Sequence, residues 1–223
     1  VVLLLSGSAN ARSVKTLSDV RDDVLKTNYK EVRIRNFNVA VQCWTYRKYS
    51  FFEALDKIKA LGISYVQAYP GQSLSKEDPE TKFNYDLSDE KIELIKAKLK
   101  DLKLSIVAFG VVSFPNTEAG TEKVFEFARK FGMREIVTEP AVDDYSLLDK
   151  MVKKYNISVA IHNHPAPNKY ANPETVLKNL QNVDDRIGIC GDTGHWLRSG
   201  FNPVEALRLL QGRVIDLHLK DLN

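Results

Sequence analysis

Residues 187–196 read IGICGDTGHW, a short apolar run that changes abruptly into acidic, glycine and histidine residues. Two other stretches change in the same way, 157–164 (ISVAIHNH) and 214–221 (VIDLHLKD). Short apolar runs bounded by polar residues are typical of buried strands in a parallel sheet. The three stretches therefore predict strands whose last residues carry the chemically active side chains.

The same alternation extends over most of the chain, with amphipathic segments between the apolar runs. Ser50 and Glu53 have the spacing of a capping box, and Pro173 and Pro203 each follow an asparagine, as at a favoured helix start. We predict seven strands, at Val39–Trp44, Ile63–Tyr69, Leu104–Val112, Glu135–Thr138, Ile157–Ile161, Ile187–Cys190 and Val214–Leu219. We predict helices between them at 51–61, 88–102, 118–131, 145–155, 173–180 and 203–210.

Strands that alternate with helices indicate an α/β fold with a parallel sheet, which can stay open or close. A doubly wound open sheet usually carries a glycine-rich turn after its first strand, but here residues 45–48 read TYRK. A closed (β/α)8 TIM barrel has eight units and takes about 250 residues. We therefore predict a TIM barrel over 38–223, truncated after strand seven, with its last βα units missing from this sequence.

The N-terminal residues are expected to lie outside the barrel domain. Residues 1–11 read VVLLLSGSANA, an apolar stretch followed by small residues, which resembles the rear half of a secretory signal peptide. A buried first strand is the alternative. Residues 12–37 are polar and predict a short helix over 14–25 and a linker. The pattern favours export to a bacterial periplasm, and a cytoplasmic location if it is not a signal remnant.

Composition excludes several classes of partner. The 32 Lys and Arg residues against 29 Asp and Glu leave a net charge of +3, too even to indicate a nucleic acid or an anionic membrane. No apolar run approaches the roughly 20 residues of a membrane-spanning helix. The two cysteines, Cys43 and Cys190, cannot build a disulfide framework and are interpreted as buried strand residues.

All four histidines lie in the last third of the chain, each at the end of a predicted strand or shortly after it. Because the carboxyl ends of barrel strands share one rim, these imidazoles should meet there with the acids Glu139 and Asp192. Such donors suit one divalent ion, Mn²⁺, Zn²⁺, Co²⁺ or Mg²⁺. The predicted metal ligands are His162, His164, Asp192 and His218.

Further side chains at the same strand ends are candidates for catalysis and substrate binding. Glu139 can serve as a base or as a ligand, and His195 and Lys220 can hold substrate oxygens. Aromatic rings pack well on a sugar ring. Three aromatic residues at the strand ends are therefore expected to form walls of the substrate pocket. The predicted substrate-binding residues are Trp44, Tyr69, Trp196 and Arg198.

The motifs IHNH (161–164), DTGHWLRSG (192–200) with NPVEAL (202–207), and DLHLKD (216–221) resemble the xylose isomerase-like barrel superfamily, specifically its sugar phosphate isomerase/epimerase proteins. The resemblance implies one divalent ion held by side chains of strands five to eight, usually Glu, Asp, His and Glu.

Asp192 matches the strand-six aspartate of that pattern and His218 the strand-seven histidine. His162 stands where many members have glutamate, so the ligand there is His162 or His164, or else Glu139 reaches in from strand four. The strand-eight glutamate has no counterpart in this sequence.

The expected activity is that of an isomerase or epimerase of a sugar or keto-sugar, in which a proton moves through a metal-stabilised enediolate. If the protein is exported, a free sugar is a better substrate than a phosphorylated one. A sugar dehydratase or lyase on the same site, or a non-catalytic carbohydrate-binding barrel, is the alternative. A nucleic-acid hydrolase is disfavoured because it needs more metal ligands and a basic groove. A homo-oligomeric state is left open.

Overall fold

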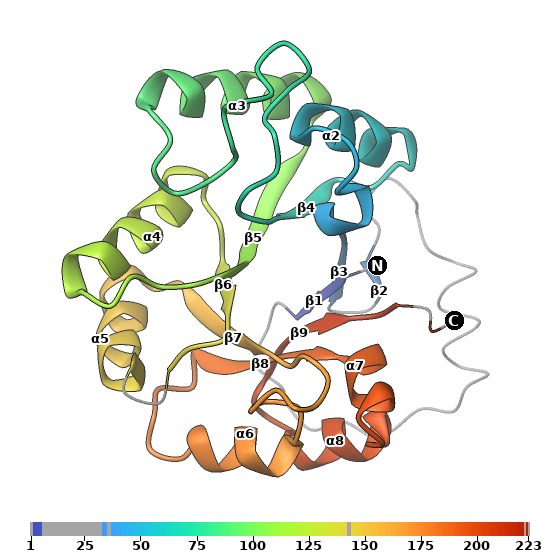
Figure 1. Ribbon diagram of the computed structural model, residues 1–223, viewed down its shortest axis with the longest axis vertical. Helices are drawn as coiled ribbons and strands as arrows, with labels where there is room; N and C mark the ends of the chain where they lie inside the picture. Colours follow the sequence, from blue (N-terminus) through green and yellow to red (C-terminus); the bar gives the residue numbers. More distant parts are fainter. Residues whose placement is uncertain (1, 6–32, 35–36, 142–143, 221, 223) are drawn as a thin grey trace.

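The computed structural model describes residues 2–5, 33–34, 37–141, 144–220 and 222. Seven parallel strands stand side by side in chain order, and the connecting helices lie around the outside of the ring (Figure 1). The strands are β3 Phe37–Gln42, β4 Tyr65–Ala68, β5 Ser105–Val112, β6 Glu135–Thr138, β7 Ser158–His162, β8 Ile187–Asp192 and β9 Val214–His218. Each coincides with a predicted strand, so the predicted α/β barrel is confirmed.

The space between β9 and β3 is filled by β1 (Val2–Leu5), which runs antiparallel to both. Val2 pairs with Ala40 of β3 and with His218 of β9, and this closes the ring. β1 thus takes the position of the parallel eighth strand of a (β/α)8 barrel. A second short strand, β2 (Arg33–Ile34), pairs antiparallel with β3.

The apolar N-terminal residues therefore form a strand here, which was the alternative to a signal remnant. Residues 6–32 lie outside the described residues, and they include the expected cleavage region and the expected helix over 14–25. Export stays a prediction.

The predicted helices are present as α2 Phe51–Ala60, α3 Asp89–Leu102, α4 Glu118–Lys130, α5 Tyr145–Tyr155, α6 Pro173–Asn179 and α8 Pro203–Leu209. The capping box is confirmed, because Ser50 Oγ accepts from the Glu53 N–H while the Ser50 N–H donates to the Glu53 carboxylate at 3.0 Å. Two further turns, η1 Cys43–Tyr46 and α7 Thr193–Arg198, follow β3 and β8. The sequence predicts a continued strand at the first and a glycine turn at the second, so both predictions are wrong there.

Large apolar side chains fill the layer between the strands and the outer helices, among them the fully buried Phe51, Phe83 and Phe127. Two separate sets of small side chains face the inside of the barrel, among them Ala40, Ala108, Val137, Ala160 and Cys190. Polar side chains are buried there as well, namely Gln67, Glu135 and Asp216. The interior of the barrel is therefore partly polar beneath the rim. Among the described residues, none of the helices is long and apolar enough to cross a membrane.

Candidate metal centre

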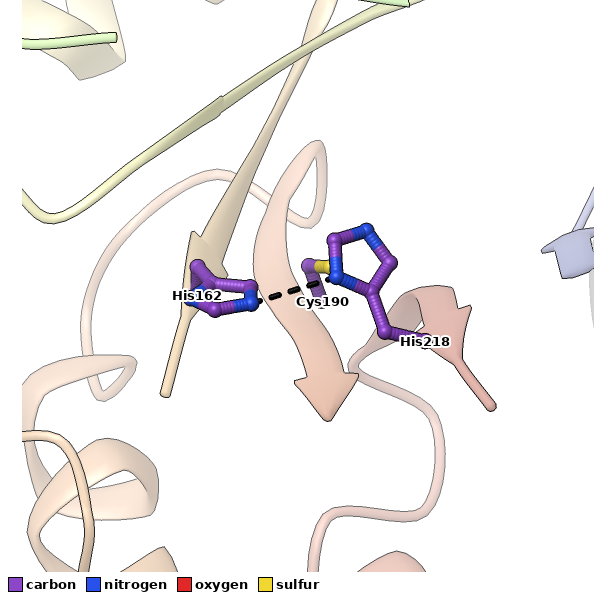
Figure 2. A group of neighbouring side chains, drawn as sticks. All are labelled: His162, Cys190 and His218. Carbon is purple, nitrogen blue, oxygen red and sulfur yellow. Dashed lines mark hydrogen bonds between the residues drawn. The ribbon is translucent and has the colours of Figure 1, made fainter. Parts of the chain in front are cut away.

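Three neighbouring strands bring His162, Asp192 and His218 to one rim. Each of these residues is the last of its strand, β7, β8 and β9 respectively. The register pairs His162 with Cys190 and Asp192 with His218, so these side chains project to the same face. Figure 2 shows the rings of His162 and His218 turned toward each other, with the Cys190 side chain from the strand between them.

The donor atoms converge at distances that suit a divalent ion. His162 Nε2 lies 3.2 Å from His218 Nδ1, and Asp192 Oδ2 lies 3.7 and 3.8 Å from these two nitrogens. Two nitrogens bound tetrahedrally at about 2.0–2.1 Å from zinc stand about 3.3 Å apart, so the observed nitrogen separation needs little adjustment. All three side chains are buried, which limits competition from water. The residues present therefore fit one divalent ion.

The charge states support this assignment. Burial opposes ionisation of Asp192, but the neighbouring His162 and Lys220 outweigh it and hold the pKa of the carboxyl below its usual range. Burial lowers the pKa of His218, which keeps that ring neutral and able to offer a lone pair. Burial also acts against protonation of His162, yet Asp192 and Glu139 raise its pKa overall. Asp192 is therefore an anionic donor and His218 a neutral donor for a cation placed between the three side chains.

Glu139 and His164 form a second group on the far side of the His162 ring. The Glu139 carboxylate contacts His164 Nδ1, accepts from Asn168 Nδ2 at 2.7 Å and lies 3.6 Å from His162 Nδ1. Burial opposes ionisation of Glu139, but these three neighbours keep its pKa below the usual range. Of the three candidates that the sequence leaves open, His162 faces Asp192 and His218, whereas Glu139 and the half-exposed His164 face each other.

His195, on α7, and Lys220 both lie next to Asp192. Asp192 caps this helix, because its Oδ1 accepts from the His195 N–H at 2.9 Å. Lys220 Nζ lies 2.8 Å from Asp192 Oδ2 and 2.8 Å from His195 Nε2. Burial lowers the pKa of His195 to about 4, so the neutral ring can accept from the lysine ammonium. The two predicted oxygen-holding residues are therefore adjacent.

The predicted substrate-binding residues separate into two groups. Trp44 and Tyr69 follow β3 and β4 at the same rim and pack edge to face, with ring centroids 5.1 Å apart. Trp44 is 54% exposed, with the Arg47 guanidinium 5.4 Å from its ring centroid, whereas Tyr69 is buried; of this pair only Trp44 is open to a ligand.

Trp196 requires a correction, because it is fully buried in the apolar core and packs over Gly191 of β8. It therefore has no face to offer a substrate. Arg198 is exposed on the last turn of α7 and pairs with no described residue.

The structure also brings to the site residues that the sequence does not single out. Gln67 Oε1 lies 2.9 Å from His218 Nε2, and Asp216 Oδ2 lies 3.5 Å from the same nitrogen. Asn163 exchanges two hydrogen bonds with the Asp192 backbone, at 2.7 and 3.1 Å. Gln67 lies near the end of a predicted strand, as the other candidates do, and this position could have indicated it as a site residue.

The fold and the donor set define a TIM barrel with a candidate divalent-metal centre at the face where such barrels hold their active sites. The chain belongs to the xylose isomerase-like TIM barrel family, whose model matches residues 55–223.

Several solved structures share this fold. An uncharacterized protein from Parabacteroides distasonis is 36% identical over 78% of this chain and 71% of its own, with a TM-score of 0.67. A D-tagatose 3-epimerase-like protein is 17% identical over 82% and 76%, with a TM-score of 0.62. A xylose isomerase-like barrel from Mycobacterium smegmatis, solved with magnesium, is 15% identical over 77% and 71%, with a TM-score of 0.59. A comparison with curated proteins found no match.

Proposed function

We propose that this chain is a divalent-metal-dependent isomerase or epimerase of a sugar or keto-sugar. The observation that carries the proposal is the convergence of His162 Nε2, Asp192 Oδ2 and His218 Nδ1 at the barrel rim. Membership of the xylose isomerase-like family supports it, as does the likeness in fold to an epimerase-like protein and to a barrel solved with magnesium.

The metal ligands are His162, Asp192 and His218. A bound divalent ion would polarise a substrate carbonyl and its neighbouring hydroxyl and so acidify the adjacent C–H bond. The buried position of the ligands excludes bulk water from that side of the substrate.

Glu139 is the base in this proposal. Its ionised carboxylate stands on the far side of His162 and takes the carbon-bound proton. Return of the proton to the neighbouring carbon gives an isomerase, and return to the opposite face of the same carbon gives an epimerase.

Lys220 holds a substrate oxygen, with the His195 ring beside it as an acceptor for one of its N–H groups. Lys220 Nζ lies 2.8 Å from Asp192 Oδ2 and 2.8 Å from His195 Nε2, so two of its three N–H groups can meet these acceptors and one is left for a substrate oxygen. The exposed Trp44 ring, braced by Tyr69, packs on the apolar face of the sugar.

The test combines metal content with proton exchange. Wild-type protein, Asp192→Asn, His218→Ala and the control Asp185→Asn are dialysed against Mn²⁺, Zn²⁺, Co²⁺ or Mg²⁺, and bound metal is measured by mass spectrometry. Asp185 is 97% exposed and its substitution should change nothing. We expect about one ion per chain in wild type and control, and loss of that ion in both site variants.

The same four proteins are then incubated in D2O with a panel of free ketoses, and exchange at carbon is followed by NMR. We expect exchange with wild type and the control only. Equal metal content in all four proteins would contradict the site. Metal binding without exchange of any sugar would contradict the activity and favour a binding barrel, and loss of water from the sugar would favour the dehydratase.

A further inference from the structure

Inside the barrel, the ring of His218 contacts Gln67, which is not one of the proposed metal ligands. Gln67 lies on β4 and is fully buried, and its side chain reaches across the barrel interior to β9. Its Oε1 lies 2.9 Å from His218 Nε2. The contact joins residues 151 positions apart in the sequence, so it exists only because the barrel is closed.

Both groups near His218 Nε2 are hydrogen-bond acceptors. Gln67 presents its amide oxygen, and Asp216 presents Oδ2 at 3.5 Å. With an oxygen atom of Gln67 and an oxygen atom of Asp216 on the same side of the ring, both neighbours are served by a proton on Nε2. The shorter Gln67 contact supplies the acceptor that this proton meets.

A proton on Nε2 determines what the opposite side of the ring can do. A neutral imidazole has one N–H and one lone pair, so His218 with its proton on Nε2 offers its lone pair at Nδ1. That nitrogen lies 3.2 Å from His162 Nε2 and 3.8 Å from Asp192 Oδ2, at the candidate metal centre. The other tautomer would turn an N–H toward the centre and could not bind a cation there.

We propose that Gln67 is a positioning residue that selects the Nε2-protonated tautomer of His218 and so prepares its Nδ1 to bind the divalent ion. This inference rests on the proposed metal centre and adds a residue from a strand that contributes no ligand. Outer partners of metal-bound histidines act in this way, and their loss typically weakens metal binding 10- to 100-fold.

The experiment uses four variants of the full chain. Gln67→Leu removes the acceptor while nearly keeping the volume, Gln67→Asn shortens the side chain, and Gln67→Glu restores an acceptor of the same length. Gln72→Leu is the matched control, because Gln72 is also buried but donates to the Tyr49 carbonyl at 3.0 Å instead of contacting His218. Zn²⁺ and Co²⁺ affinities are measured by titration calorimetry.

We expect Gln67→Leu and Gln67→Asn to bind these ions about 10- to 100-fold more weakly than wild type. Gln67→Glu and Gln72→Leu should remain within about threefold, a difference of roughly 0.65 kcal/mol by RT ln 3. Wild-type affinity in Gln67→Leu, or a Gln67→Glu variant as weak as Gln67→Leu, would overturn the proposal.

A second readout is made on metal-free protein, so that it does not depend on the proposed activity. Long-range ¹H–¹⁵N spectra of the histidine rings should show His218 protonated at Nε2 in wild type and a mixture of tautomers in Gln67→Leu. If wild type binds no divalent ion, the proposed function fails, yet the spectra still decide the role of Gln67. An Nδ1-protonated His218 in wild type would refute the positioning role.

Discussion

Glu135 offers a test of the buried polar interior that does not depend on any substrate. The side chain is almost fully buried inside the barrel, and its Oε1 meets no hydrogen-bond partner among the described residues. Burial and the neighbouring negative charge of Asp216 raise the pKa of its carboxyl well above the usual range. We expect Glu135→Gln, which replaces this acid with a neutral amide of the same shape, to change how stability depends on pH.

The sign follows from the direction of the pKa shift. Because the folded state holds the Glu135 proton more tightly than the unfolded state, unfolding releases a proton between the two pKa values. The stabilising contribution is fully present below the unfolded pKa of about 4.3 and falls as the pH rises. The loss is about 1.4 kcal/mol per pH unit for one proton, and it ends above the folded pKa. Glu135→Gln should therefore gain about 1.4 kcal/mol relative to wild type for each pH unit within this window.

The assay is urea unfolding of wild type, Glu135→Gln and the exposed control Glu90→Gln at several pH values from 4 to 8, with a chelator present. The chelator removes any contribution from bound metal. We expect the free-energy difference between Glu135→Gln and wild type to grow with pH, and that of the control to stay flat. A difference that does not vary with pH would show that Glu135 ionises alike in both states, which would refute the reasoning.

Three further outcomes are expected. Glu139→Gln should keep its bound metal but slow proton exchange about 10²- to 10⁴-fold, because it removes the ionised base; unchanged exchange rates by NMR would exclude Glu139 as the base. Metal affinity should begin to fall just above the usual histidine pKa of about 6.5 and keep falling as the pH drops below it. The pKa of His162 is raised and that of Asp192 is lowered, so protons compete with the metal for the ring and not for the carboxylate. Equilibrium dialysis that shows a constant affinity from pH 8 to 5.5 would contradict this. Gly191→Ala should destabilise the protein by about 1–3 kcal/mol, because its new Cβ would lie 2.7 Å from the Trp196 ring; an unchanged urea midpoint would speak against that packing.

The strands could be predicted because each is a short apolar run that ends in polar residues. The rim position of His162, Asp192 and His218 then followed from the rule that carboxyl ends of barrel strands share one face. Closure by β1 could not be predicted, because the five-residue apolar run 1–5 is equally typical of a strand and of part of a signal peptide.

Trp196 shows where adjacency in the sequence misleads. It follows His195 directly, which favoured a place at the rim, but both residues lie on α7. Consecutive residues on a helix point about 100° apart, since a turn takes 3.6 residues. His195 thus faces Asp192, while Trp196 turns into the core over Gly191. The sequence does contain an indication of helix α7, because aspartate is a favoured N-cap residue and Asp192 stands three residues before His195.

Gln67 could not be connected to His218 from the sequence, because contacts across the barrel interior depend on the stagger of the strands. The nearness of Asp216 to His218 could be predicted, since residues two apart on a strand share a face. The burial of Gln67 and Asp216 still carries a physical argument. Polar groups inside a barrel cost stability unless each finds a partner, and apolar residues would fill the same space without that cost. Here the partner is His218, whose Nε2 meets both acceptors while its Nδ1 faces the metal centre. Burial of Gln67 and Asp216 is therefore best explained as support for one ligand of the rim, with stability given up at the place where the orientation of a ring matters most.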